Sequence, residues 1–172
     1  MGYAHSLTTE ASLKVGTTLE QVVTALAPLF DYFGYDGFKA FAGKARTGDN
    51  QFSFDPESGW LELSTSGEVG YSFRDLVVDA AAALGPLTET PSEFVLSDYD
   101  TGDLDDAREE ILYGATVEAV ERYEFQNNLG YAMSLLDTHL PRDVVSNLRE
   151  IAEKAYQAKT VATPAAEQGV SA

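Results

Sequence analysis

The chain has 172 residues and carries 28 acidic against 11 basic residues, which gives a formal charge of -17 at pH 7. Its length suits one domain with a single core. It contains no cysteine, which excludes disulfide bonds, thiolate catalysis and cysteine-ligated metals. The acidity disfavours direct binding to nucleic acid or to an anionic membrane and favours a basic protein partner, although an acidic proteome would produce the same charge without any such partner.

Residues 7–15 predict a strand, because apolar or small residues alternate there with polar ones. Gly16 interrupts this pattern, and a helix is expected to begin near Leu19. A capping box, in which side chain and backbone groups satisfy each other, should precede the helix. Two pairs have the required spacing, Thr17 with Glu20 and Thr18 with Gln21. Pro28 should kink or restart this helix, since proline removes a backbone donor.

The middle of the chain predicts a loop, a hairpin and a second helix. Lys39, Lys44 and Arg46 form a local basic cluster that we interpret as a loop, with a counter-charge to the acidic residues or a phosphate contact as alternatives. Residues 51–66 predict a β-hairpin, because two alternating segments flank the turn sequence at 55–59. Ser72 should cap the helix that follows, and Gly85 should end it. The apolar face of this helix comprises Phe73, Leu76, Val77, Ala80, Ala81 and Leu84.

The most acidic part of the chain is residues 98–110, which we call the acidic segment. It holds seven carboxylates in thirteen residues, opposed only by Arg108. Strand-like residues flank it at 94–96 and 110–113, so we interpret it as the tip and flanks of a β-hairpin. An EF-hand loop that begins at Asp98 would need glycine at its sixth position, but Gly102 is the fifth. A looser calcium or magnesium site stays an alternative, with candidate ligands Asp98, Asp100, Asp103 and Asp105.

The last third of the chain predicts helices. Helical spacing begins at Thr116, falters around residues 127–130 and resumes from Tyr131 to Leu140. Pro141 should start a final helix. The expected buried stripe of this helix is Val144, Val145, Leu148, Ile151 and Ala155. Residues 160–172 are predicted to be a disordered tail, which leaves a single α+β domain over residues 1–159.

This order of elements predicts an α+β fold. We expect an antiparallel or mixed sheet of about five strands with two helices on one face, followed by a C-terminal helical extension. The first six elements have the order of a ferredoxin-like unit. Element order alone says nothing about function, because one fold serves many functions.

No catalytic or cofactor motif is found in the sequence. The two histidines, His5 ahead of the first strand and His139 near a helix end, are interpreted as exposed or satisfied structural residues. The sequence has no nucleophile elbow and no glycine-rich phosphate loop, so we expect no cofactor and no enzymatic activity. It has neither a secretion signal pattern nor a long apolar run, so we expect a cytoplasmic location, in the host if a phage encodes the protein.

The functional hypothesis therefore rests on the net negative charge and on the clustered acidic residues. We expect a non-enzymatic inhibitor or adaptor that binds a basic, nucleic-acid-binding protein, with carboxylates that imitate nucleic-acid phosphates as phage inhibitors of restriction and CRISPR systems do. The expected partner-binding residues are Asp98, Asp100, Asp103, Asp105, Asp106, Glu109, Glu110, Glu118, Glu121 and Glu124.

Two alternative functions remain open. The first is an acidic accessory protein with an apolar interface around Tyr32, Tyr35 and Phe38. The second is a metal-dependent hydrolase that gathers carboxylates from several elements. A homo-oligomer is also open, and it would use the aromatic surface or the last helices because carboxylate-rich faces repel each other.

Overall fold

The computed structural model describes residues 3–32, 44–47, 50–70, 72–98 and 108–162. Contacts within the chain divide it into two compact units, Met1–Tyr123 and Glu124–Ala172. We call them the sheet unit and the helical unit and describe each by itself. The single domain expected over residues 1–159 stays a prediction.

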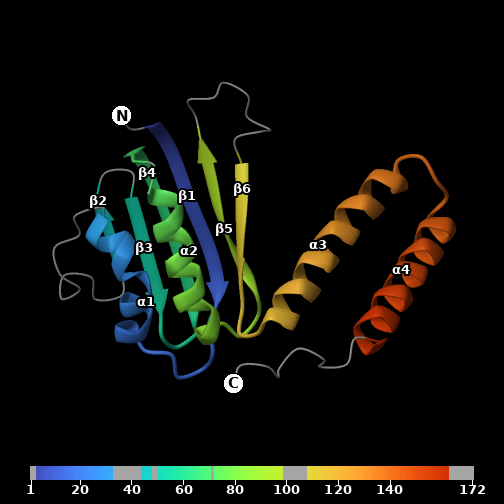
Figure 1. Cartoon of the computed structure of the whole chain (residues 1–172), viewed down its shortest axis with the longest axis horizontal. Helices are drawn as coiled ribbons and strands as arrows, with labels where there is room; N and C mark the ends of the chain where they lie inside the picture. The colour runs from blue at the N-terminus through green and yellow to red at the C-terminus, as the bar shows by residue number, and fades with distance from the viewer. Residues whose placement is uncertain (1–2, 33–43, 48–49, 71, 99–107, 163–172) are drawn as a thin grey trace, which may run out of the picture. The chain divides into compact units, whose positions relative to one another are not determined.

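In the described part of the chain, the sheet unit has six strands in one antiparallel sheet, in the order β2-β3-β4-β1-β5-β6 (Figure 1). The strands are β1 (Tyr3–Ser12), β2 (Lys44–Thr47), β3 (Asn50–Asp55), β4 (Trp60–Val69), β5 (Ser92–Asp98) and β6 (Arg108–Tyr113). The helices are α1 (Leu19–Tyr32) and α2 (Phe73–Leu84), and the 3-10 turn η2 (Gly85–Leu87) follows α2. The predicted α+β class is confirmed, and the sheet, expected to be antiparallel or mixed with about five strands, is antiparallel with six in the described part of the chain.

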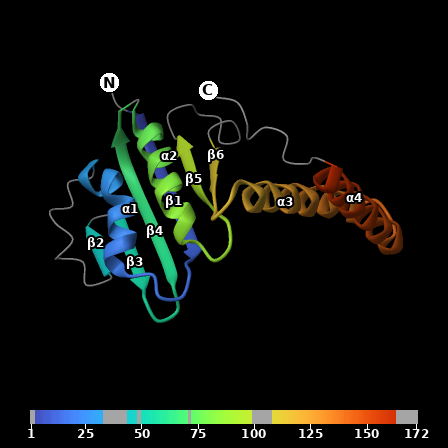
Figure 2. The same cartoon turned by 60° about the horizontal axis from the view of Figure 1, so that its bottom comes forward.

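Alternation along the strands separates a core from an outer face. Every second strand residue, such as Leu7 on β1, Leu63 on β4 and Phe94 on β5, belongs to one core with the buried residues of α1 and α2. Figure 2 shows these two helices beside each other along the sheet. Because successive strand side chains point to opposite faces, the intervening residues lie on the face away from this core, which we call the outer face.

The first strand and helix differ from the prediction at their ends. β1 ends at Ser12 and Leu13 makes one further bridge, while Val15 is 98% exposed and not buried as predicted. The physical reason is the turn at Gly16, whose positive φ of 89° takes the chain out of the strand. The helix α1 continues through Pro28 to Tyr32 without a restart.

The start of α1 decides between the two predicted capping boxes. The backbone N of Thr18 donates to Gln21 Oε1 at 2.8 Å, and the backbone N of Gln21 donates to Thr18 Oγ1 at 3.3 Å. Thr18 and Gln21 therefore form the reciprocal pair. At α2 the predicted cap is wrong, because Ser72 occupies the N-cap position with helical φ and ψ and its side chain makes no cap hydrogen bond.

Of two predicted connections in the sheet unit, the hairpin over residues 51–66 is confirmed and the loop that contains Lys44 and Arg46 is not. The hairpin of β3 and β4 is confirmed, and its turn is held by the Asp55 carboxylate, which accepts from Glu57 N at 3.0 Å and from Ser58 Oγ at 2.7 Å. The loop predicted for the basic cluster is wrong at Lys44 and Arg46, which lie on β2 and pair with β3. Lys39 lies outside the described residues.

The helical unit is an antiparallel pair, α3 (Val117–Asp137) and α4 (Arg142–Ala162), with α3 beginning in the sheet unit (Figure 1). The predicted break at residues 127–130 is absent, because Leu129 and Met133 pack with Val145 of α4 and this tertiary contact outweighs weak local propensity. Of the predicted tail, residues 160–162 belong to α4, and residues 163–172 lie outside the described residues. None of the described helices has the length and apolar character that crossing a membrane requires.

The buried stripe predicted for α4 is wrong in four of its five positions. Only Val145 is buried, since the helix pairs with a single neighbour in the helical unit and turns one narrow face toward it. The exposed members of the stripe are Val144, Leu148, Ile151 and Ala155.

Candidate functional site

A row of glutamates crosses the outer face of the sheet. Glu62 on β4 lies directly opposite Glu10 on β1. Glu93 lies on the next strand, β5, where Thr9 Oγ1 donates to the Glu93 carbonyl oxygen at 2.7 Å. The register of β1 and β5 ends with Thr8 opposite Val95, and its continuation brings Glu93 opposite Glu10. Neighbouring strands are about 4.8 Å apart, so the three residues follow one another across the sheet at about this backbone spacing. We call Glu62, Glu10 and Glu93 the carboxylate row.

Strand alternation places each member of the row on the outer face. Glu10 lies between the buried residues Thr9 and Ala11, and Glu62 lies between two buried leucines. Glu93 precedes the buried Phe94. The row cannot be recognised in the sequence alone, although alternation already directs each side chain away from the core. The missing information was the register, which decides that the three residues lie beside one another.

The carboxylate row is only partly compensated. Like charges directly opposite each other destabilise an antiparallel pair. Gln51 Nε2 donates to Glu62 Oε1 at 3.2 Å, which stabilises one member. On the same face, Arg108 Nη2 lies 2.9 Å from Glu110 Oε1. Among the described residues, no lysine or arginine forms an ion pair with a member of the row.

Glu93 is the least solvated member of the row. Burial raises the pKa of its carboxyl group, the charge of Glu110 raises it further, and Arg108 opposes the shift. In the described part of the chain, Glu93 Oε2 is buried without a hydrogen-bond partner. Its carboxyl group therefore retains a proton to higher pH than an ordinary glutamate does.

The predicted hairpin around the acidic segment is confirmed, since β5 pairs antiparallel with β6 and Ser97 lies opposite Arg108. Asp98 is the last residue of β5, where its Cα pairs with that of His5. The central acids Asp100, Asp103, Asp105 and Asp106 lie outside the described residues.

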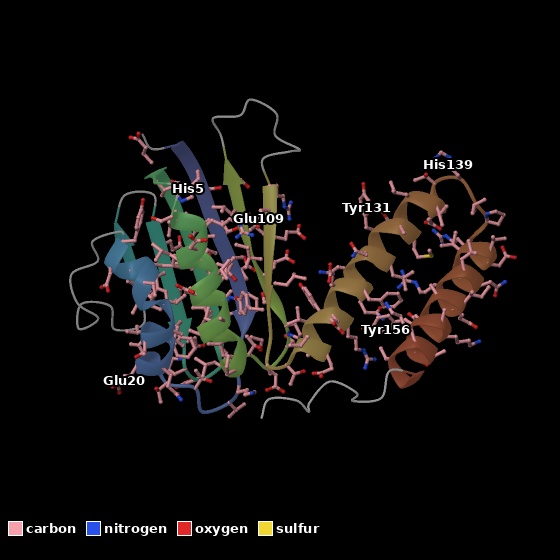
Figure 3. All side chains as sticks on the ribbon, viewed as in Figure 1. His5, Glu20, Glu109, Tyr131, His139 and Tyr156 are labelled. Carbon is pink, nitrogen blue, oxygen red and sulfur yellow. The ribbon has the colours of Figure 1, made fainter. Side chains whose placement is uncertain are left out.

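The two glutamates at the start of β6 face opposite sides of the sheet. Glu110 is on the outer face, whereas Glu109 lies opposite the buried Leu96, on the core side (Figure 3). Arg74 of α2 binds Glu109 with two nitrogens, Nη2 at 2.6 Å and Nε at 2.9 Å from Oε1. This bidentate ion pair engages Glu109 within the sheet unit.

The glutamates predicted on the following helix are exposed. Glu118, Glu121 and Glu124 all lie on α3, three residues apart. Positions three apart are neighbours on a helix surface, so each glutamate lies next to the following one.

The histidines have structural positions. His5 lies inside β1 and not ahead of it as predicted, and it is buried. Its Nδ1 donates to the Gly67 carbonyl oxygen at 2.8 Å, and its ring centroid lies 4.4 Å from that of Phe73. His139 is exposed in the turn after α3, as predicted (Figure 3).

The two alternative functions were a metal-dependent hydrolase and an accessory protein with an apolar interface. For a metal site, no three His, Asp or Glu side chains are grouped among the described residues so as to hold an ion. For an apolar interface, a groove of about 480 Å³ lies in the sheet unit and includes Val78 of α2, Leu112 of β6 and Val117 of α3 among its lining residues. Tyr32 is partly exposed, and its hydroxyl accepts from Gly70 N at 2.8 Å. Tyr35 and Phe38 lie outside the described residues.

The model of a family of unknown function matches residues 5–156, which include most of both units. Neither the curated proteins nor the solved structures contain a match to the chain.

Proposed function

The chain belongs to this family, DUF6806, whose function is unknown, and from the chain's own structure we propose that it is a small non-enzymatic inhibitor or adaptor that binds a basic, nucleic-acid-binding protein. The observation that carries the proposal is the carboxylate row on the outer face of the sheet. A rigid antiparallel sheet holds these charges at fixed positions, which reduces the entropy that binding must overcome.

Glu10 on β1 pairs directly with Glu62 on β4. This pairing opposes the stability of the sheet, and a polar uncharged residue at either position would remove the repulsion. Residues that break a local rule without local compensation are expected at functional sites. Lysines and arginines of a partner would supply the missing counter-charges.

The proposed surface extends beyond the row. Glu110 lies on the same face, and the acidic segment adds Asp98, Asp100, Asp103, Asp105 and Asp106, with Glu118, Glu121 and Glu124 on α3 as further contacts. We leave Glu109 out of the surface, because it lies on the core side and Arg74 binds it with two nitrogens. Glu110 stays in the surface, because it lies on the outer face and Arg108 contacts it with one nitrogen only. Carboxylates spaced a few ångströms apart would imitate phosphates, the strategy of phage proteins that inhibit restriction or CRISPR systems, and we place that action in the host cytoplasm.

We also infer that the sheet unit is a ferredoxin-like arrangement with strands added at both edges. The elements β1, α1, β3, β4, α2 and β5 follow the required order along the chain. The sheet order β3-β4-β1-β5 supports this inference, and so does the common core that α1 and α2 share with one face of the sheet. Such an arrangement leaves the outer face available to a partner.

The test is affinity capture from the native host at low ionic strength, followed by mass spectrometry. We expect a basic, nucleic-acid-binding protein that is released as salt is raised, because electrostatic association weakens with ionic strength. A variant with Glu10, Glu62 and Glu93 changed to Gln should lose this partner, and so should a variant with Asp103, Asp105 and Asp106 changed to Lys.

A matched control neutralises three exposed carboxylates on the helices. The control carries Glu20→Gln, Asp31→Asn and Asp79→Asn. It should capture the partner as the wild type does, because these residues lie on α1 and α2. Capture that survives both the row variant and the acidic-segment variant refutes the proposal. Capture that persists at high salt would instead favour an apolar interface, with the groove beside α2 as its first candidate.

A further inference from the structure

The helical unit has an apolar surface that its own core does not use. The core of this unit is small, with Leu129, Met133 and Val145 as its buried residues. Large apolar side chains remain outside it, and Tyr131, Leu135 and Ile151 are 70%, 52% and 63% exposed, respectively. Isolated exposed apolar residues are ordinary, but a contiguous group marks an interaction site.

The exposed residues of α4 have the spacing of a helix-packing seam. Val144, Leu148, Ile151 and Ala155 are separated by four, three and four residues, and Ala158 continues the series. This alternation of four and three is the pattern of positions that pack against a second helix in a coiled coil or bundle. The seam is separate from the face that contains Val145, so α4 has two apolar faces, one of which is covered by α3.

One residue of α3 extends this surface across the pair. The 3.6-residue period places Leu135 on the same side of the antiparallel pair as the α4 seam, with Ala132 beside it and Tyr131 at its margin. We call Leu135, Val144, Leu148, Ile151 and Ala155 the apolar face of the helical unit.

Charge is distributed unevenly between the two units. The helical unit holds six acidic and four basic residues, a net charge of -2, whereas the sheet unit holds 22 acidic and seven basic residues, a net charge of -15. No member of the apolar face is charged. The 3.6-residue period places Glu124, eleven residues before Leu135, on the same side of α3, so Glu124 is a charge beside this face. The face itself offers a basic partner no counter-charge, and two identical copies of it meet with little repulsion.

We propose that this face binds the same face of a second copy of the chain, so that two helix pairs form a four-helix bundle. Two pairs related by a two-fold axis present self-complementary surfaces, and four helices enclose a core that two helices cannot. The 21 residues of α4 span about 31 Å. The apolar residues of α4 reach only from Val144 to Ala158, about 21 Å, so a face two helices wide covers about 420 Å² on each copy. The total of ~840 Å² is the size of a weak, concentration-dependent interface.

The test is the molar mass of the full chain in solution, measured by light scattering across a ~100-fold range of concentration. We expect twice the chain mass of 18.6 kDa at the upper end of that range. The dimer should become more stable as salt is added, because salt screens the repulsion between two chains of charge -17. This dependence is opposite to that expected for the basic partner, so either proposal can fail independently of the other.

Two variants and a control locate the interface. Leu148→Glu combined with Ile151→Glu should give a monomer, and the gentler Ile151→Ala, which keeps high helix propensity, should weaken the dimer at least tenfold. Val15→Glu is the control, because Val15 is 98% exposed in the sheet unit, and this variant should remain a dimer. Circular dichroism should show unchanged helix content in all three. A wild-type chain that stays monomeric throughout the range overturns the proposal, as does a dimer that both variants leave intact.

Discussion

Replacing Glu62 by Gln should raise the stability of the sheet unit, although it removes a residue of the proposed binding surface. Glu62 and Glu10 are directly opposite in the register, which places their carboxylates roughly 6 Å apart. Two unit charges at ~6 Å in water repel by about 0.7 kcal/mol, and screening reduces this to about 0.5 kcal/mol. Glutamine keeps the oxygen that accepts from Gln51, so the gain is not offset by a lost hydrogen bond.

The measurement is urea unfolding followed by tryptophan fluorescence. Trp60 is the only tryptophan and lies on β4, so its signal reports the sheet unit. With a slope of about 2 kcal/mol per molar urea, a gain of about 0.5 kcal/mol raises the midpoint by ~0.25 M. Glu20→Gln is the control, and it should lower the urea midpoint. Glu20 lies in the first turn of α1, where a negative charge stabilises the helix by about 0.3–1 kcal/mol.

Salt supplies the second half of this test. The gain from Glu62→Gln should shrink at high ionic strength, because screening already weakens the repulsion in the wild type. If the variant is no more stable than the wild type at low ionic strength, the carboxylates do not repel. The inference that the fold retains them against its own stability would then be refuted.

Two further predictions concern backbone packing and pH. Gly59→Ala should lower the free energy of unfolding by at least ~2 kcal/mol, because φ is 72° and a Cβ atom would lie 2.5 Å from the Leu13 carbonyl oxygen. Gly16→Ala, with φ of 89° and open space, should cost only about 1 kcal/mol, and equal urea midpoints for the two variants would contradict this reasoning. Because the folded pKa of Glu93 is raised, the wild type gains stability as pH falls through that pKa and loses it above. Glu93→Gln should therefore exceed the wild type in stability at neutral pH by a margin that shrinks at acid pH, and a margin independent of pH would contradict it.

The helical part of the chain shows where local patterns failed. Helices were predicted in this part of the chain, but the break expected at residues 127–130 is absent and residues 160–162, expected in the tail, continue α4. The face that α4 buries was not predicted either. The stripe of Val144, Leu148 and Ile151 has the spacing of a buried face and is exposed. Period alone identifies an apolar face of a helix, whereas its burial depends on which neighbour the chain supplies.

The sequence by itself determined the α+β class, the hairpin of β3 and β4, the hairpin of β5 and β6, and the apolar face of α2. These features depend on side-chain periodicity and turn chemistry, which act between residues close in the chain. The sequence also showed that acidic residues are concentrated in residues 98–110, because charged residues can be counted without a structure. Only the tertiary structure decided that Glu62, Glu10 and Glu93 lie side by side and that Glu109 is engaged by Arg74. The physical reason is that register and strand order are set by the packing of residues distant in sequence, and a shift of one residue would turn every carboxylate of a strand to the other face.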